Sequence, residues 1–397
     1  MHTLEQLRRG ECQGATRLKL SVQLTEFPEE IYSLADTLEV LDLSGNQLTD
    51  LPSDFFRLTK LKILFGSNNP FTHVPEVLGE MPELEMIGFK SCHIKTVSEQ
   101  CLPAKTRWLI LTDNRIETLP NGIGRLERLE KLMLAGNRLR ALPDSFAQLH
   151  RLKLLRLAAN QLQAFPNVLL TLPQLAWLAF SGNPFCAPRS QHQEFMQLPS
   201  SDIQCYEELG QGASGVISRA TWLNNPHRFP EHIAIKIYKG EVTSDGYPAD
   251  ELDACLTAGV HQNLVTPLAH ILEPDCTALV MDLIPVNYSN LGQPPSLESC
   301  TRDTFTQGQS FNASQAAYII EQMHDLVAHL EAKKVCHGDL YAHNVLINRD
   351  GHILFGDFGA ASKYAHLSAE QQSGIRRIER RALTYFEQDI LGLVSQS

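Results

Sequence analysis

The stretches Leu61-Lys-Ile-Leu-Phe-Gly-Ser-Asn-Asn69 and Leu129-Glu-Lys-Leu-Met-Leu-Ala-Gly-Asn137 share one pattern of spaced apolar residues that ends in asparagine. Copies of this pattern begin at residues 38, 61, 84, 106, 129, 152 and 175, so the period is close to 23 residues. The third copy has Cys92 at the asparagine position. A fixed period of this length indicates stacked units, because one unit cannot bury its apolar side chains alone.

This pattern resembles the leucine-rich repeat, L-x-x-L-x-L-x-x-N/C-x-L. We therefore expect an N-terminal cap at residues 1–14 and a leucine-rich-repeat domain at 15–187. The expected fold is an α/β solenoid with its strands on the concave side. Each asparagine should satisfy backbone groups of a neighbouring turn that would otherwise be buried without a partner.

Within each predicted strand, two side chains face the concave surface instead of the core. These positions are unusually apolar, and they include Ile63, Phe65, Met86, Trp108, Ile110, Met133 and Trp177. Exposed apolar surface of this extent is typical of a binding site. We expect this stripe to contact a protein substrate, a regulatory partner or the chain's own C-terminal half.

Composition and charge exclude several classes of function. The nine cysteines have no close pair at metal-ligand spacing, and no apolar run is long enough to span a membrane. These features predict a cytoplasmic protein without a membrane partner. Residues 1–200 carry 21 Lys and Arg against 21 Asp and Glu, whereas residues 201–397 carry 13 against 24. The resulting net charge of −11 argues against nucleic acid as the main partner.

A second informative stretch is His337-Gly-Asp-Leu-Tyr-Ala-His-Asn344, which is followed by Asp357-Phe-Gly359. The amide of Asn344 lies five residues after the carboxylate of Asp339, and the carboxylate of Asp357 lies eighteen residues after it. The second interval has room for a hairpin of two short strands over 345–355. Such a hairpin would bring the three side chains together.

This order and spacing resemble the catalytic loop and the Asp-Phe-Gly motif of protein kinases. The resemblance implies that Asp339 orients an acceptor hydroxyl. It also implies that Asn344 and Asp357 hold Mg²⁺ on the phosphates of ATP.

An earlier glycine-rich stretch, Leu209-Gly-Gln-Gly-Ala-Ser-Gly-Val-Ile217, could by itself equally open a dinucleotide-binding unit. A strand is predicted after it instead of a helix, and Ile233-Ala-Ile-Lys-Ile237 then resembles the third strand of protein kinases. Glycines allow the backbone to approach phosphates closely. The resemblance implies ATP contacts at Leu209, Gly210, Gly212, Gly215, Ile217, Ala234, Lys236, Met281, Asp282 and Ile284.

Lys236 needs a carboxylate to hold it in place. Glu251 opens a predicted helix over residues 251–259 and is the preferred partner. Asp253 is an alternative with a shorter side chain, and both residues could instead be solvated charges on the helix surface.

Two positions depart from the kinase pattern. Gly338 replaces an arginine that in many kinases pairs with a phosphate on the activation loop, so switching by that route is not expected. Tyr341 replaces a lysine that neutralises the transferring phosphoryl group. Near the end of the chain, the arginines between Arg376 and Arg381 are interpreted as a solvated helix face with Glu379 as a local partner.

The combination resembles the bacterial leucine-rich-repeat protein kinases. It implies a linker at 188–201 and a two-lobed α+β kinase domain with a minimal C-lobe at 202–397. The expected activity is ATP-dependent phosphorylation of Ser or Thr in a protein, including the chain itself. Two alternatives stay open. One is an ATP-binding switch that controls the repeat surface, and the other is a small-molecule phosphotransferase.

Overall fold

The computed structural model describes residues 2–212, 214–225, 228–240 and 242–395. The chain divides into two compact units. The first unit consists of Met1–Leu175 and Asn183–Phe185, and the second consists of Ala176–Gly182 and Cys186–Ser397. The division therefore falls inside the seventh repeat, whereas the sequence placed the boundary after residue 187.

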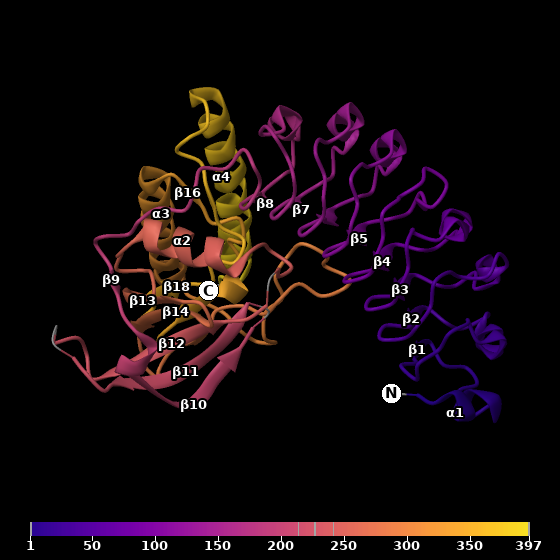
Figure 1. Ribbon diagram of the computed structural model, residues 1–397, viewed down its shortest axis with the longest axis horizontal. Coiled ribbons are helices and arrows are strands. Elements are labelled where there is room, and N and C mark those ends of the chain that lie inside the picture. The colour runs from indigo at the N-terminus through magenta and orange to yellow at the C-terminus, as the bar shows by residue number, and fades with distance from the viewer. Residues whose placement is uncertain (1, 213, 226–227, 241, 396–397) are drawn as a thin grey trace. The chain divides into compact units, whose positions relative to one another are not determined.

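The first unit is built from short parallel strands in consecutive order. After helix α1 (Leu4–Arg8), the strands are β1 (Arg17–Lys19), β2 (Val40–Asp42), β3 (Ile63–Phe65), β4 (Met86–Gly88), β5 (Trp108–Ile110), β6 (Lys131–Met133) and β7 (Leu154–Arg156). Each strand pairs in register with the next, so that Ile63 lies opposite Met86 and Met86 opposite Trp108. Figure 1 shows these strands along one side of a curved row and helical turns along the other.

The segments that return between the strands form 3₁₀-helices. They are η1 (Glu29–Leu34), η2 (Phe55–Arg57), η3 (Glu76–Glu80), η4 (Asn121–Arg125), η5 (Asp144–Gln148) and η6 (Asn167–Thr171). A proline stands immediately before every one of these except η2. Because proline fixes its own φ and donates no backbone hydrogen bond, it sets where each helical turn can begin.

The asparagines form the expected ladder of buried hydrogen bonds. The side-chain N–H groups of Asn137 donate to the carbonyl oxygens of Leu111 at 2.8 Å and Leu134 at 3.0 Å. Its side-chain oxygen accepts from the backbone N–H of Ile116 at 3.1 Å. At the third position Cys92 makes weaker contacts, from Sγ to the carbonyl oxygens of Gly66 at 3.5 Å and Lys90 at 3.6 Å. The predicted role of the asparagines is confirmed.

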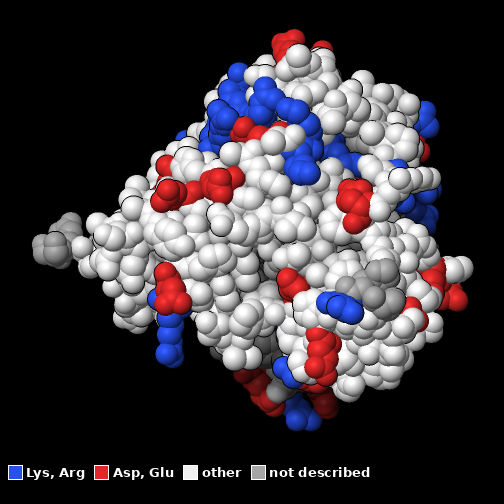
Figure 2. Space-filling model, turned by 90° about the vertical axis from the view of Figure 1, so that its left-hand side faces the viewer, with Lys and Arg blue, Asp and Glu red and all other residues white. Residues whose placement is uncertain are grey.

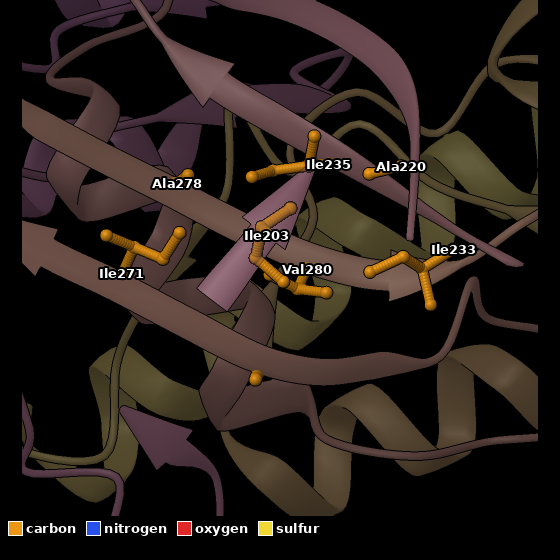
Figure 3. Close-up of a cluster of buried hydrophobic side chains, with 8 residues drawn as sticks. Ile203, Ala220, Ile233, Ile235, Ile271, Ala278 and Val280 are labelled. Atoms are coloured by element: carbon orange, nitrogen blue, oxygen red, sulfur yellow. The ribbon is translucent and has the colours of Figure 1, made fainter. Parts of the chain in front are cut away.

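The second unit contains a sheet whose strand order is β10-β11-β12-β14-β13-β9. The strands are β9 (Met196–Gln197), β10 (Ile203–Gln211), β11 (Gly215–Trp222), β12 (His232–Tyr238), β13 (Pro267–Glu273) and β14 (Cys276–Asp282). The side chains of Ile233, Ile235, Ile271 and Val280 gather in one buried cluster (Figure 3). Because side chains alternate along a strand, Ala234 and Lys236 face away from this cluster.

Helix α2 (Pro248–Ala258) connects β12 to β13 in the chain, and two longer helices follow later in the unit. Helix α3 (Ala313–Lys333) begins at Asn312, which forms the predicted capping box with Gln315. Helix α4 (Ala369–Gly392) is the last helix of the described chain. The remaining elements are β8 (Trp177–Ala179), η7 (Ser200–Asp202), β15 (Ser289–Asn290), β16 (Val335–Cys336), η8 (Ala342–Asn344), β17 (Val345–Ile347), β18 (Ile353–Phe355) and β19 (Ser362–Lys363).

The hairpin predicted between the two motifs is present. Strands β17 and β18 pair antiparallel, with Val345 opposite Phe355.

In the part of the chain that the structure describes, no helix has the length and apolar character needed to cross a bilayer. Figure 2 shows Lys and Arg side chains gathered in one region of the surface, while Asp and Glu are more scattered.

Candidate active site

A cavity of about 560 Å³ in the second unit collects most of the residues that the sequence predicted for nucleotide contact. The glycine-rich stretch and Lys236 line it. Residues of β14 and of the segments around Asn344 and Asp357 complete the lining. The predicted residues in its lining are Leu209, Gly210, Gly212, Gly215, Ile217, Lys236, Met281, Ile284, Asn344 and Asp357. Glu251 also lines it, but Ala234, Asp282 and Asp339 do not, although Ala234 pairs with Met281 across β12 and β14.

Lys236 and Glu251 form a buried ion pair at the back of this cavity. The ammonium of Lys236 donates to Oε1 of Glu251, whose side chain is 4% exposed, and Oδ1 of Asp357 lies 3.8 Å from Nζ of Lys236. Burial disfavours the charged ammonium, but the two carboxylates outweigh it and raise the pKa of Lys236. Lys236 therefore stays cationic and in a fixed position beside Asp357.

Asp253, the alternative partner, points to a different set of groups. Its carboxylate lies 2.6 Å from Nζ of Lys363 and 2.7 Å from Nε2 of His192, and it accepts from the backbone N–H of Ser190 at 2.9 Å. The third possibility, that Glu251 and Asp253 are both solvated, is wrong because both are buried. Asp253 instead ties the segment before β9 to helix α2.

The residues of the predicted catalytic loop, Asp339 and Asn344, are held by hydrogen bonds within the loop. Nδ2 of Asn344 donates to Oδ2 of Asp339 at 2.8 Å and to the Asp339 carbonyl at 3.0 Å. Asp357 has a φ of +56°, which a non-glycine residue adopts at an energetic cost. Its side chain is 60% exposed and faces the cavity. Asn344 and Asp357 thus present oxygen atoms at the same cavity as Lys236.

Glu379 is a functional candidate that sequence reasoning missed. It is 4% exposed, so its assignment to a solvated helix face is wrong. Its carboxylate accepts from the backbone N–H of His337 at 3.0 Å and of Gly338 at 3.3 Å, and from the thiol of Cys336 at 2.8 Å. Burial raises the pKa of Glu379 against the effect of these donors. A polar residue in register with Ile375, Ile378 and Ala382 was the available signal.

Asp303 supports the other end of the same loop. Its carboxylate accepts from the backbone N–H of Ala342, and it lies 2.6 Å from Nδ1 of His343. Asp303 is 9% exposed, although the sequence around it is polar and irregular. No local pattern predicts this contact, because the partners lie 39 and 40 residues further along the chain.

Trp177, predicted as part of the stripe, contacts the C-terminal half of the chain, which is one of the three partners expected for the stripe. Its side chain is 1% exposed, so it cannot belong to an open binding stripe. Within the second unit its ring stacks on that of Tyr341, with 4.4 Å between ring centroids and an interplanar angle of 8°. It also stacks on the ring of Tyr385, with 5.3 Å between centroids and an interplanar angle of 18°. Its indole N–H donates to the carbonyl oxygen of Leu340 at 3.0 Å.

The other members of the predicted stripe belong to the first unit. Met86 is buried, whereas the rest are half-buried: Ile63, Phe65, Trp108, Ile110 and Met133. The ammonium of Lys131 lies 3.9 Å from the ring centre of Trp108, which is a cation–π distance. The remaining stripe is thus smaller and less exposed than the sequence indicated.

Gly338 has a steric explanation. Its φ is +72°, and a Cβ atom there would lie 2.6 Å from the carbonyl oxygen of Ala360 and 2.7 Å from that of Leu178. Both atoms are backbone, so they cannot move aside as a flexible side chain would. Arginine is therefore excluded at this position by the close approach of two other backbone segments.

Comparison with known proteins agrees with this geometry. The family model for protein tyrosine and serine/threonine kinase matches residues 203–385, and the model for leucine rich repeat matches 36–94, 104–162 and 127–185. The chain joins leucine-rich repeats to a protein kinase domain. The kinase match covers the whole cavity lining, and the repeat matches cover β2 to β8.

Among curated proteins, the serine/threonine-protein kinase PITSLRE of Drosophila melanogaster is 29% identical over 167 residues, which is 41% of this chain and 16% of that protein. Cyclin-dependent kinase 11B of Mus musculus is 26% identical over 168 residues, with 41% and 19% covered. The alignments thus span less than a fifth of these relatives. A leucine-rich-repeat protein of Leptospira interrogans is 30% identical over 42% of this chain and 49% of that chain, with a TM-score of 0.35.

Proposed function

We propose that the kinase domain transfers the γ-phosphoryl group of Mg-ATP to a serine or threonine hydroxyl of a protein. The observation that carries this proposal is that Lys236, Glu251, Asn344 and Asp357 line one cavity, while Asp339 is hydrogen-bonded to Asn344. A volume of about 560 Å³ lies within the range of cofactor pockets.

Nucleotide binding is assigned to the glycine-rich stretch and Lys236. The glycines at 210, 212 and 215 line the cavity, and at Gly210 and Gly212 an added Cβ would meet nothing within 4 Å. The backbone there is therefore open to a phosphate group. Lys236 supplies a fixed positive charge beside Asp357, and Glu251 keeps it from turning away.

The side chains fit a magnesium ion. Both N–H contacts of the Asn344 amide go to Asp339, which leaves its carbonyl oxygen as a ligand atom. Asp357 contributes carboxylate oxygens from an exposed side chain, and oxygen ligands are those that Mg²⁺ prefers. A bound magnesium ion supplies positive charge that offsets the charge of the phosphates.

Asp339 is assigned the role of orienting the acceptor hydroxyl and receiving its proton. The hydrogen bond from Asn344 fixes one carboxylate oxygen, Oδ2. Glu379 holds the backbone immediately before Asp339. The carboxylate is thus positioned by groups that are themselves held in place.

The environment of Tyr341 favours a second candidate, a nucleotide-binding switch with little transfer. Tyr341 is 4% exposed beneath Trp177, so nothing at that position supplies the cation found in many kinases. Electrostatic stabilisation of the transferring group would then depend on Lys236 and the metal ion.

We further propose that the repeats bind a protein. The half-buried apolar residues Ile63, Phe65, Trp108, Ile110 and Met133 lie on β3, β5 and β6 of one parallel sheet, with the buried β4 between β3 and β5. Surfaces that are rich in aromatic residues and methionine are typical of protein interfaces.

Incubation of the purified chain with γ-labelled Mg-ATP and a general protein acceptor tests the proposed activity. Asp339→Asn should abolish labelling and leave nucleotide affinity nearly unchanged. The matched control is Asp350→Asn in the exposed turn between β17 and β18, which should label like the wild type. Label on phosphotyrosine alone would contradict the acceptor assignment, and nucleotide binding without any label would favour the switch.

A further inference from the structure

Strand β8 belongs to the kinase unit although it is the strand of the seventh repeat. Residues 176–182 are placed there by their contacts. They reach three parts of the kinase domain: the catalytic loop, the segment after Asp357-Phe-Gly359, and helix α4. We propose that β8 positions the catalytic loop through Trp177, an inference that rests on the proposed transferase activity.

The first contact lies directly beside the proposed catalytic carboxylate. The indole N–H of Trp177 donates to the carbonyl oxygen of Leu340, the residue that follows Asp339. On the other side of Asp339, the backbone N–H of Gly338 donates to Glu379. The backbone is therefore held on both sides of Asp339, once by α4 and once by β8.

The second contact is an aromatic stack that restricts the conformation of the loop at Tyr341. The Trp177 ring is nearly parallel to the rings of Tyr341 and Tyr385, and both Trp177 and Tyr341 are at most 4% exposed. A buried stack of this kind restricts rotation of Tyr341 and the backbone next to it. Tyr341 thus has a packing role at the position where other kinases place a cation.

The third contact reaches the segment after the Asp-Phe-Gly motif. The backbone N–H groups of Phe180 and Ser181 donate to Oγ of Ser362 at 2.9 and 3.1 Å. Ser362 is 1% exposed. One short strand therefore binds both segments that carry the proposed catalytic and metal-binding side chains, Asp339 and Asp357.

The approach of β8 also explains why a phosphate-pairing arginine is absent. A Cβ atom at Gly338 would lie only 2.7 Å from the carbonyl oxygen of Leu178. In this chain a covalently attached strand occupies the place beside the catalytic loop, and it needs no phosphorylation to stay there. The compact unit that contains the kinase domain accordingly includes residues 176–182 as well.

The test compares Trp177→Phe with Trp222→Phe in the full chain. Phenylalanine retains an aromatic ring but removes the hydrogen bond to Leu340. For Trp177→Phe we expect a roughly tenfold to hundredfold loss of kcat, because small displacements of a catalytic group have effects of this size. The KM for ATP should change less than about twofold, since Trp177 does not line the nucleotide cavity. Trp222→Phe, which likewise removes an indole hydrogen bond to a backbone carbonyl but lies outside the cavity lining, should leave both constants unchanged.

A purely structural role would lower the melting temperature and the fraction of nucleotide-binding molecules without changing kcat per binding site. That result, or wild-type kcat in Trp177→Phe, would overturn the proposal. A second readout is independent of transfer: amide hydrogen exchange across residues 337–344 should accelerate in Trp177→Phe and not in Trp222→Phe. If the wild type transfers no phosphate, the activity fails but this exchange result still decides whether Trp177 positions the loop.

Discussion

The carboxylate of Glu379 accepts a hydrogen bond from the backbone N–H of His337 at 3.0 Å, across 42 residues of sequence. The N–H of Gly338 and the thiol of Cys336 donate to the same group. Three consecutive residues of the catalytic segment are thus anchored to one buried side chain of α4. The loop geometry depends on this anchor as much as on the motif residues themselves.

Replacement of Glu379 by alanine should destabilise the kinase unit and abolish transfer. Each buried donor left without an acceptor costs about 1–3 kcal/mol, so we expect a loss of at least about 3 kcal/mol in urea unfolding. Glu379→Gln keeps one acceptor oxygen and should lose less. The control is Glu370→Ala, at an exposed position in the first turn of α4. Equal stabilities of the two alanine variants would refute the anchoring role.

Lys236→Met should cost stability as well as nucleotide binding. Removing one partner of a buried ion pair leaves the other charge without compensation, at a cost of about 3–5 kcal/mol. The double variant Lys236→Met with Glu251→Leu removes both charges and should recover most of that stability without recovering transfer. Denaturant unfolding and nucleotide titration together measure the two effects. A double variant no more stable than the single one would contradict the pairing.

Asp253 gives the kinase unit a predictable response to acid. Burial opposes its ionisation, but hydrogen bonds from His192, Lys363 and the Ser190 backbone lower its pKa below the usual 3.8. The unfolded chain therefore binds this proton at a higher pH than the folded chain does. The stabilisation is fully present above about pH 4 and is lost as the pH falls through the folded pKa.

Asp253→Asn should accordingly lower the melting temperature at neutral pH, and its melting temperature should fall less than that of the wild type between about pH 5 and pH 3. Scanning calorimetry over this range provides the measurement. Asp275→Asn, which changes a carboxylate in the turn between β13 and β14, should retain the slope of the wild type. Parallel curves for wild type and Asp253→Asn would show that the carboxylate does not contribute.

Much of this architecture could be predicted from local sequence patterns. The spacing of Leu and Asn set the strands of the repeats, and the interval between Asp339 and Asp357 set the β17–β18 hairpin. In both cases the interacting groups lie within one repeat period or one hairpin. Short-range periodicity is sufficient for such elements because the local pattern itself determines their geometry.

The contacts that hold the catalytic loop could not be predicted in this way. Trp177 donates a hydrogen bond to Leu340, 163 residues away in the sequence. Glu379 accepts one from His337, 42 residues away. The alternation of side chains along β8 predicts only that the Trp177 side chain points away from the core of the repeats. What covers it depends on tertiary packing. The same limit applies to Asp303, whose surrounding sequence resembles an ordinary polar loop.

Cys92 offers a test of the asparagine ladder by gain of stability. In the fourth repeat, Asn114 donates to the carbonyl oxygens of Phe89 and Leu111 and accepts from the N–H of Ile94. Cys92 occupies the equivalent place with weaker sulfur contacts. An asparagine there would reach the same kinds of group on the third repeat. Cys92→Asn should therefore stabilise the first unit by about 1 kcal/mol.

Guanidinium unfolding of Cys92→Asn, with Asn137→Ala as the opposite change, measures this effect. Asn137→Ala should destabilise by about 2 kcal/mol or more, because it leaves buried carbonyl and N–H groups without partners. A higher free energy of unfolding for Cys92→Asn and a lower one for Asn137→Ala would show that the asparagine ladder can stabilise a repeat that lacks it. A loss in both variants would mean that the third repeat has adapted its packing to sulfur, since asparagine would then be too polar or too large for the space around Cys92.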